Sequence, residues 1–152
     1  MYRVKDPKRS IEFYENVIGM THIIEMKMPA GNFSLHFLGF RVPAEVLKGS
    51  DEDRKAYVFS QKGILELTHN WGTEDDPNQS YKVGNADGVG YGHIAIVVDD
   101  LDAAVERMDK MGVRWIKKPQ DGSMKTIAFV ADPDGYWIEL LPRNTNKNGF
   151  SR

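Results

Sequence analysis

Two segments of the chain carry apolar residues at the spacing of an amphipathic helix. The first begins at Asp6-Pro7, an N-cap residue followed by proline at the first helical position, and ends at Gly19. The second begins at Asp99-Asp100 and ends at Gly112. Each segment follows a short apolar stretch and precedes several segments of β type, so the helices mark the same place in two halves of the chain.

Apolar runs around these helices predict the strands. In the first half they are 1–4, 23–26, 34–40, 57–60 and 64–68, and in the second half 94–98, 113–116, 126–130 and 136–141. The turn 132–135, with sequence DPDG, precedes the last strand. Both halves therefore have the order strand, helix and about three strands, which predicts an α+β fold of two tandem βαβββ modules.

Polar stretches separate and extend the two modules. A glycine-containing stretch, 72–90, lies between the halves, and a charged stretch, 48–55, lengthens the first half. We expect both to be surface loops. The expected organisation is one domain over 1–143, with a first module of about 1–71, a loop of 72–90, a second module of about 91–143 and a flexible tail of 144–152.

Composition then excludes several classes of protein. The 152 residues include 20 basic and 22 acidic side chains, and the formal charge of −2 gives no general attraction to nucleic acid or an anionic membrane. No apolar run approaches the length of a membrane span. There is no cysteine, which excludes disulfides, thiolate metal ligands and cysteine nucleophiles. We expect a cytoplasmic protein with a small-molecule substrate.

One acidic residue interrupts the last predicted strand of each module. Glu66 lies in the sequence ILEL and Glu139 in the sequence WIEL. Alternation places Glu66 on the same face as Ile64 and Thr68, among largely apolar neighbours. A carboxylate there is costly unless it is paired or bound to a cation. A single such residue is consistent with a solvent-facing edge strand, but two at matching repeat positions favour a functional pair.

His93 begins the first strand of the second module, a defined place in the repeat. Together with Glu66 and Glu139 it forms a set suited to a divalent ion such as Zn²⁺, Ni²⁺, Co²⁺ or Mn²⁺. The other histidines are expected to be ordinary hydrogen-bonded residues: His22, His36 and His69. The repeat partner of His93 falls just before Met1, so we expect either that a few residues have been removed there or that one ligand has been lost.

Several longer phrases resemble the glyoxalase I (lactoylglutathione lyase) family, in its longer, zinc-type eukaryotic form. They are 3–8 (RVKDPK), 13–14 (FY), 19–20 (GM), 65–76 (LELTHNWGTEDD), 92–94 (GHI), 117–119 (KKP), 121–122 (DG) and 132–140 (DPDGYWIEL). The resemblance covers nearly the whole chain except its last ten residues. The phrases 65–76 and 132–140 are highly specific in combination.

The resemblance implies a cupped mixed sheet and a homodimer with each active site at the subunit interface. It implies isomerisation of the hemithioacetal of methylglyoxal and glutathione to S-D-lactoylglutathione. Three family metal ligands fall on Glu66, His93 and Glu139, and the fourth, a glutamine, would precede Met1. The implied ion is Zn²⁺, with Ni²⁺ or Co²⁺ as alternatives. Glu139 would be the principal base, and Glu66 a ligand and second base.

The resemblance also implies contacts to the thiol cosubstrate, glutathione. Arg3 and Asn70 stand where the family holds its γ-glutamyl end. Met124 falls in the loop that closes over the substrate.

Two positions depart from the family pattern. Val89 and Ser123 replace an arginine and a lysine, and each loses a cation worth about 1–3 kcal/mol if the contact is charge-assisted. We expect nearby cations to compensate: Lys117, Lys125 or Arg143.

Two alternatives accompany this interpretation. Ring-cleaving dioxygenases and fosfomycin-modifying enzymes share the architecture, but they have histidine where this chain has Glu66. A non-catalytic or metal-deficient protein that binds a ligand in the same cup is favoured by the missing N-terminal ligand, Val89 and Ser123. Thioester formation from methylglyoxal and glutathione would distinguish the enzyme from the binding protein.

Overall fold

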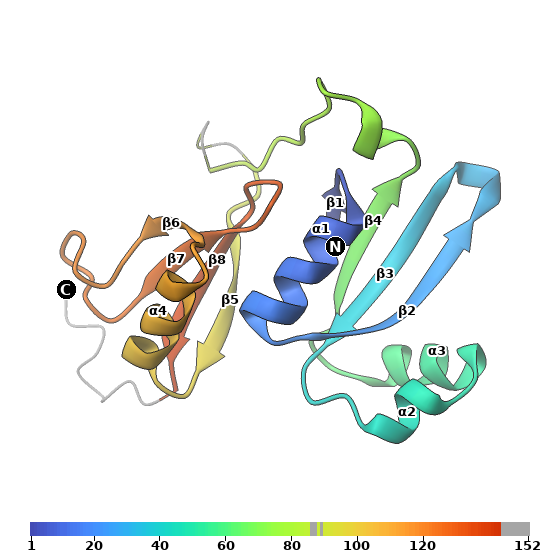
Figure 1. Cartoon of the computed structure of the whole chain (residues 1–152), viewed down its shortest axis with the longest axis horizontal. Coiled ribbons are helices and arrows are strands. Elements are labelled where there is room, and N and C mark those ends of the chain that lie inside the picture. The colour runs from blue at the N-terminus through green and yellow to red at the C-terminus, as the bar shows by residue number, and fades with distance from the viewer. Residues whose placement is uncertain (86–87, 89, 144–152) are drawn as a thin grey trace. The chain divides into compact units, whose positions relative to one another are not determined.

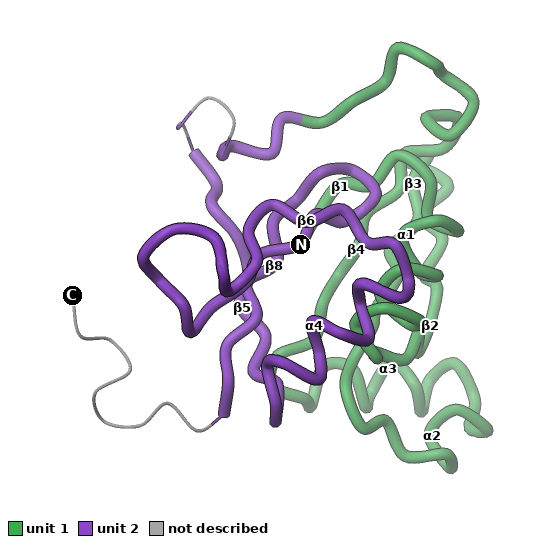
Figure 2. Tube along the Cα trace, turned by 60° about the vertical axis from the view of Figure 1, so that its left-hand side comes forward, with its two compact units in different colours: residues 1–81 green, residues 82–152 purple. Residues whose placement is uncertain are grey.

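The computed structural model describes residues 1–85, 88 and 90–143 (Figure 1). The chain divides into two compact units, residues 1–81 and residues 82–152 (Figure 2). The boundary between the units lies within the stretch 72–90. The module limits of about 1–71 and 91–143 stay a prediction. Within the described part of the chain, no helix has the length and apolarity needed to span a membrane.

The first unit is a four-stranded mixed sheet with helices. Its strands lie in the order β1-β4-β3-β2, with β1 parallel to β4 and the other neighbours antiparallel. The elements are β1 (Tyr2–Val4), α1 (Pro7–Phe13), a π-helical turn (Tyr14–Ile18), β2 (Thr21–Met28), a 3-10 turn (Pro29–Gly31), β3 (Phe33–Gly39), α2 (Ala44–Lys48), α3 (Asp51–Ser60), β4 (Leu65–Asn70) and a second 3-10 turn (Thr73–Asp75).

The second unit repeats this topology. Its strands lie in the order β5-β8-β7-β6, with β5 parallel to β8 and the remaining neighbours antiparallel. The elements are β5 (His93–Val98), α4 (Leu101–Lys110), β6 (Arg114–Lys117), β7 (Ala128–Ala131) and β8 (Trp137–Pro142). The α+β class and the two tandem βαβββ modules are therefore confirmed.

The helix boundaries follow the capping residues. Asp6 Oδ1 accepts a hydrogen bond from the backbone N–H of Lys8 at 2.9 Å, and Asp100 Oδ1 caps α4 by accepting one from the N–H of Ala103 at 3.0 Å. Gly19 ends the first helical segment at φ 86°, and Gly112 follows α4 at φ 67°. Both are in the left-handed region, where a side chain is disfavoured, so both predicted helix ends are confirmed.

The prediction of a loop at 48–55 is wrong, because this stretch belongs to two short helices. Ser50 and Asp53 form a reciprocal capping box: the Asp53 backbone N–H donates to Ser50 Oγ at 3.2 Å, and the Ser50 N–H donates to Asp53 Oδ2 at 3.0 Å. These bonds satisfy backbone donors at the start of α3. A charged stretch that carries a capping box therefore forms a helix here.

The prediction of a strand at 57–60 is also wrong, because these residues form the last turn of α3. Val58 is buried against Ile24 and Phe37, so the short apolar run is the inner stripe of a helix. Three apolar or aromatic residues in a row do not distinguish one helical turn from a short strand.

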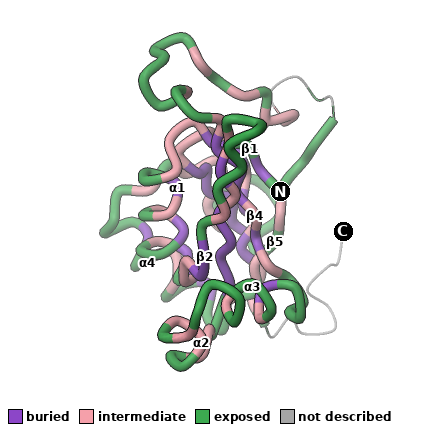
Figure 3. The backbone as a smooth tube through the Cα atoms, turned by 90° about the vertical axis from the view of Figure 1, so that its right-hand side faces the viewer, coloured by how far each residue is buried: buried purple, intermediate pink, exposed green. Residues whose placement is uncertain are grey.

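The core of the first unit lies on both faces of its sheet. Val4, Leu38 and Leu67 are fully buried on one face, where α1 crosses β4 (Figure 1). Ile24 and Phe37 pack with α3 on the other face. Figure 3 shows that α2 and α3 are exposed over most of their length while the strands carry buried residues.

Candidate active site

Glu66 lies on β4 with its side chain on the face opposite to α1. It stands directly across from Phe37 of β3, and Thr68 Oγ1 donates a hydrogen bond to Glu66 Oε1 at 3.4 Å. Arg3 lies opposite Thr68 on β1, and Asn70 ends β4 two residues later. Because alternate residues share a face, the predicted ligand and both predicted γ-glutamyl contacts lie on one side of this sheet.

His93 and Glu139 meet in the second unit. The parallel register pairs His93 with Trp137 and Ala95 with Glu139, which puts the two predicted metal ligands on one face. The distance from His93 Nε2 to Glu139 Oε2 is 3.3 Å. The Glu139 side chain is 17% exposed and that of His93 is 37% exposed. An imidazole nitrogen and a carboxylate oxygen therefore converge at a partly open position.

An aromatic ring supports this pair. Phe129 of β7 lies directly across from Glu139, and its ring meets the His93 ring edge to face, with centroids 5.1 Å apart. The same relation occurs in the first unit, where Phe37 lies across from Glu66. Each carboxylate thus has an apolar ring on the neighbouring strand, which raises the cost of leaving its charge unpaired.

The chemistry of these donors fits a divalent ion of the zinc, nickel or cobalt type. Glu66 belongs to the first unit and the other two residues to the second, so joint coordination of one ion by all three stays a prediction. Among residues 1–85, 88 and 90–143, no three histidine, aspartate or glutamate side chains are grouped closely enough to hold a metal.

The two lysines predicted to bind substrate hold a loop in this structure. Lys117 Nζ donates to the backbone carbonyls of Lys118 and Ile127, each at 3.2 Å, and to that of Met124. Lys125 Nζ donates to the carbonyl of Gln120 at 2.7 Å.

Met124 itself is 57% exposed on this loop. A direct role of Lys117, Lys125 or Met124 in substrate binding stays a prediction. Ser123 is exposed, Arg143 pairs with Asp99, and Val89 lies outside the described residues.

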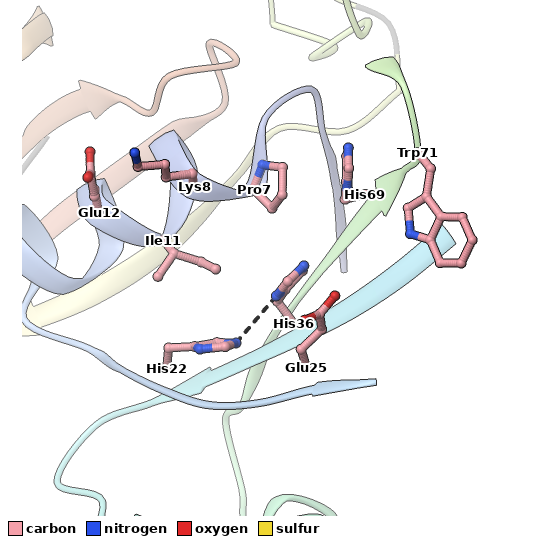
Figure 4. A pocket seen from close by; sticks show the side chains of 9 residues that line it. All are labelled: Pro7, Lys8, Ile11, Glu12, His22, Glu25, His36, His69 and Trp71. Atoms are coloured by element: carbon pink, nitrogen blue, oxygen red, sulfur yellow. Dashed lines mark hydrogen bonds between the residues drawn. The ribbon is translucent and has the colours of Figure 1, made fainter. Parts of the chain in front are cut away.

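A second group of side chains was missed by sequence reasoning. His22, His36 and His69 line one crevice of the first unit, together with Glu25 (Figure 4). His36 Nδ1 lies 3.3 Å from His22 Nε2, and His69 Nε2 lies 2.6 Å from a carboxylate oxygen of Glu74. His69 lies on the face of β4 opposite to Glu66, because the two residues are three positions apart on the strand. Strand alternation puts His36 and His69 on the face opposite to Glu66, but the sequence has no signal for the bulge beside His22.

Burial in the crevice keeps the imidazoles of His22 and His36 neutral. Burial, followed by repulsion from His22, lowers the pKa of His36 from 6.5 to about 4. Burial also lowers the pKa of His22, although the neighbouring Glu15 opposes this shift. Near pH 7 both rings are therefore unprotonated and have one nitrogen lone pair each.

Comparison with known proteins places this architecture in a family. Residues 1–140 match the family model described as the Glyoxalase/Bleomycin resistance protein/Dioxygenase superfamily. The chain belongs to the glyoxalase family. Among its glyoxalase relatives, the lactoylglutathione lyase of Pseudomonas aeruginosa is 48% identical over 146 residues, which is 96% of this chain and 81% of the relative.

Two further relatives extend the comparison. The glyoxalase I of Saccharomyces cerevisiae is 46% identical over 93% of this chain, and the match spans 41% of the longer yeast protein. Among solved glyoxalase structures, the trypanothione-dependent glyoxalase I of Leishmania major superposes with a TM-score of 0.67 at 35% identity, covering 93% of this chain and 83% of that one.

Proposed function

We propose that this chain is a lactoylglutathione lyase. It would isomerise the hemithioacetal of methylglyoxal and glutathione to S-D-lactoylglutathione and so detoxify methylglyoxal. The observation that supports this most is the convergence of His93 and Glu139 at 3.3 Å in a chain 48% identical to a protein of that name. Dioxygenase chemistry is disfavoured because Glu66 stands where those enzymes have histidine.

A divalent ion is part of the proposal. Glu66, His93 and Glu139 would hold it, and Zn²⁺ suits two carboxylates and an imidazole, as do Ni²⁺ and Co²⁺. When bound, such an ion supplies Lewis-acid stabilisation of the negative charge that develops on the substrate oxygens.

Glu139 is the proposed base. Its carboxylate accepts the proton from the carbon that bears sulfur and returns it to the neighbouring carbon. The hydroxyl proton of the first carbon passes to the oxygen of the neighbouring carbon, so that the aldehyde-derived carbon becomes the thioester carbonyl. The side chain is 17% exposed and lies across from Phe129, which limits the water that could exchange with the transferred proton. Glu66 is the proposed second base.

Glutathione would bind along the face that carries Glu66. Arg3 and Asn70 lie on that face and match its γ-glutamyl carboxylate and amine, respectively, as donor and acceptor partners. On the second unit the loop that carries Met124 would cover the substrate, with Lys117 and Lys125 as its nearby cations. Trypanothione is a second candidate thiol, because the Leishmania major relative is dependent on it.

The proposal includes a homodimer, with active sites at the subunit interface, in the cytoplasm. The test is thioester formation from methylglyoxal and glutathione by the zinc-loaded chain, monitored by the absorbance of the thioester. Turnover that a chelator abolishes and that Zn²⁺ restores would support the enzyme. A folded chain that binds an S-substituted glutathione without turnover would instead support the non-catalytic binding protein.

A further inference from the structure

We propose that His22 and His36 form a second metal site, which binds one divalent transition-metal ion through two imidazole nitrogens. The site lies in the crevice beside α1, on the face of the first sheet opposite to Glu66 (Figure 4). It uses none of the residues assigned to the isomerisation, so it stands or fails independently of the proposed function.

The distance between the two nitrogens fits such an ion. Two nitrogens bound at about 2.0–2.1 Å to one tetrahedral ion lie about 3.3–3.4 Å apart. His36 Nδ1 and His22 Nε2 are 3.3 Å apart. Without an ion one ring nitrogen donates a hydrogen bond to the other, and a bound ion would take the place of that proton. The pair thus has the spacing of two metal ligands before any ion is present.

The sheet holds the two rings in this arrangement. His36 of β3 lies across from Glu25 of β2. His22 of β2 lies across from Leu38, which follows His36 by two residues on β3. A bulge after His22 shifts the register of β2, and the His22 backbone N–H donates to Glu15 Oε1 at 2.9 Å. The strand register therefore places the backbones of His22 and His36 before any ion binds, so binding need not order these parts of the chain.

The surrounding charge favours a cation. Glu12 and Glu25 line the crevice, and a neighbouring hollow that shares His22 and Glu25 is lined by Glu15 and Asp51. Two basic residues oppose these four carboxylates: Lys8, which lines the crevice, and Arg54, which pairs with Asp51. The carboxylates outnumber the basic groups, and both imidazoles are neutral near pH 7, which is the form that binds metal.

One buried nitrogen in the crevice lacks a hydrogen-bond partner within the described part of the chain. His36 is 6% exposed, and its Nε2 atom has no hydrogen-bond partner among the described residues. A buried polar group of this kind is destabilising until it is satisfied. The crevice has a volume of about 530 Å³, so an ion could enter with water molecules, which would complete its coordination and reach this nitrogen.

Zinc stoichiometry of the full chain tests the site. Equilibrium dialysis with Zn²⁺ near pH 7.5 is expected to give one ion fewer per chain for His22→Leu than for the parent. This difference holds whether or not Glu66, His93 and Glu139 bind an ion of their own. Glu106→Gln on the exposed surface of α4 is the matched control, because it removes a carboxylate outside the crevice and keeps both imidazoles, and its stoichiometry is expected to equal that of the parent.

Cobalt spectroscopy gives the second measurement. Co²⁺ added to the parent is expected to produce visible d–d absorption of tetrahedral type, part of which comes from Co²⁺ in the crevice. His22→Leu and His36→Phe are each expected to lower the Co²⁺ affinity measured from this part of the absorption at least tenfold. His22 is only partly buried, so its replacement is compatible with folding. Equal Zn²⁺ stoichiometry and equal Co²⁺ spectra in the parent and in folded His22→Leu would overturn the proposal.

Discussion

Acidification is expected to destabilise the first unit through His36. The pKa of this side chain is about 4 in the folded chain and about 6.5 when the chain is unfolded. The unfolded chain therefore binds a proton first as the pH falls. The folded chain keeps full stability from this group above pH 6.5 and loses it progressively as the pH falls toward 4.

The size of the effect follows from the two pKa values. Between pH 7 and pH 5, proton linkage at His36 alone lowers the free energy of unfolding by about 2 kcal/mol. Below pH 4 the whole contribution of His36 to the free energy of unfolding is lost, which amounts to about 3 kcal/mol. The groups that face His36 are His22, Glu25 and His69, and His22 contributes in the same direction because its pKa is also lowered.

Urea unfolding at pH 7 and pH 5, with a chelator present, measures this loss. The matched variant is His36→Phe, which keeps a ring of similar size and removes both nitrogens. Its loss of stability between the two pH values is expected to be smaller than that of the parent by about 2 kcal/mol. Equal losses in the parent and in His36→Phe would refute the assignment of the effect to this residue.

Three further perturbations test other parts of the structure. Ser50→Ala removes the cap of α3 and is expected to cost about 1 kcal/mol in urea unfolding, and an unchanged midpoint would contradict the capping role. Met108→Ala empties a fully buried position of α4 and is expected to cost about 2–5 kcal/mol, whereas a loss under about 1 kcal/mol would mean that the site is loosely packed. Lys117→Ala removes the donor to three loop carbonyls, so limited proteolysis is expected to cut the loop 118–127 faster than in the parent. In the control variant, Lys55→Ala, this loop is expected to be cut at the parental rate.

Local rules in the sequence predicted much of the fold. Asp6 and Asp100 cap helices and Gly19 ends one, because these features depend on residues within a few positions of each other. The shared face of Glu66 and Thr68 follows from strand alternation alone. The internal repeat predicted two modules with the same order of elements along the chain, and the two units indeed share one strand order.

Features that depend on packing between distant segments were not predicted. The turn at 57–60 is helical because Val58 packs against Phe37, which is far away in the sequence. The histidine crevice arises because a bulge in β2 brings His22 to within 3.3 Å of His36, and a two-residue period contains no signal for a bulge.

Replacement of Glu139, the proposed base, is the most direct test of the proposed function. Under zinc saturation, Glu139→Gln is expected to lower kcat for thioester formation from methylglyoxal and glutathione by about 10²–10⁴-fold. Glu106→Gln on the exposed surface of α4 is the matched control, and its kcat is expected to equal that of the parent. Full turnover by Glu139→Gln would contradict the assignment of this carboxylate as the base.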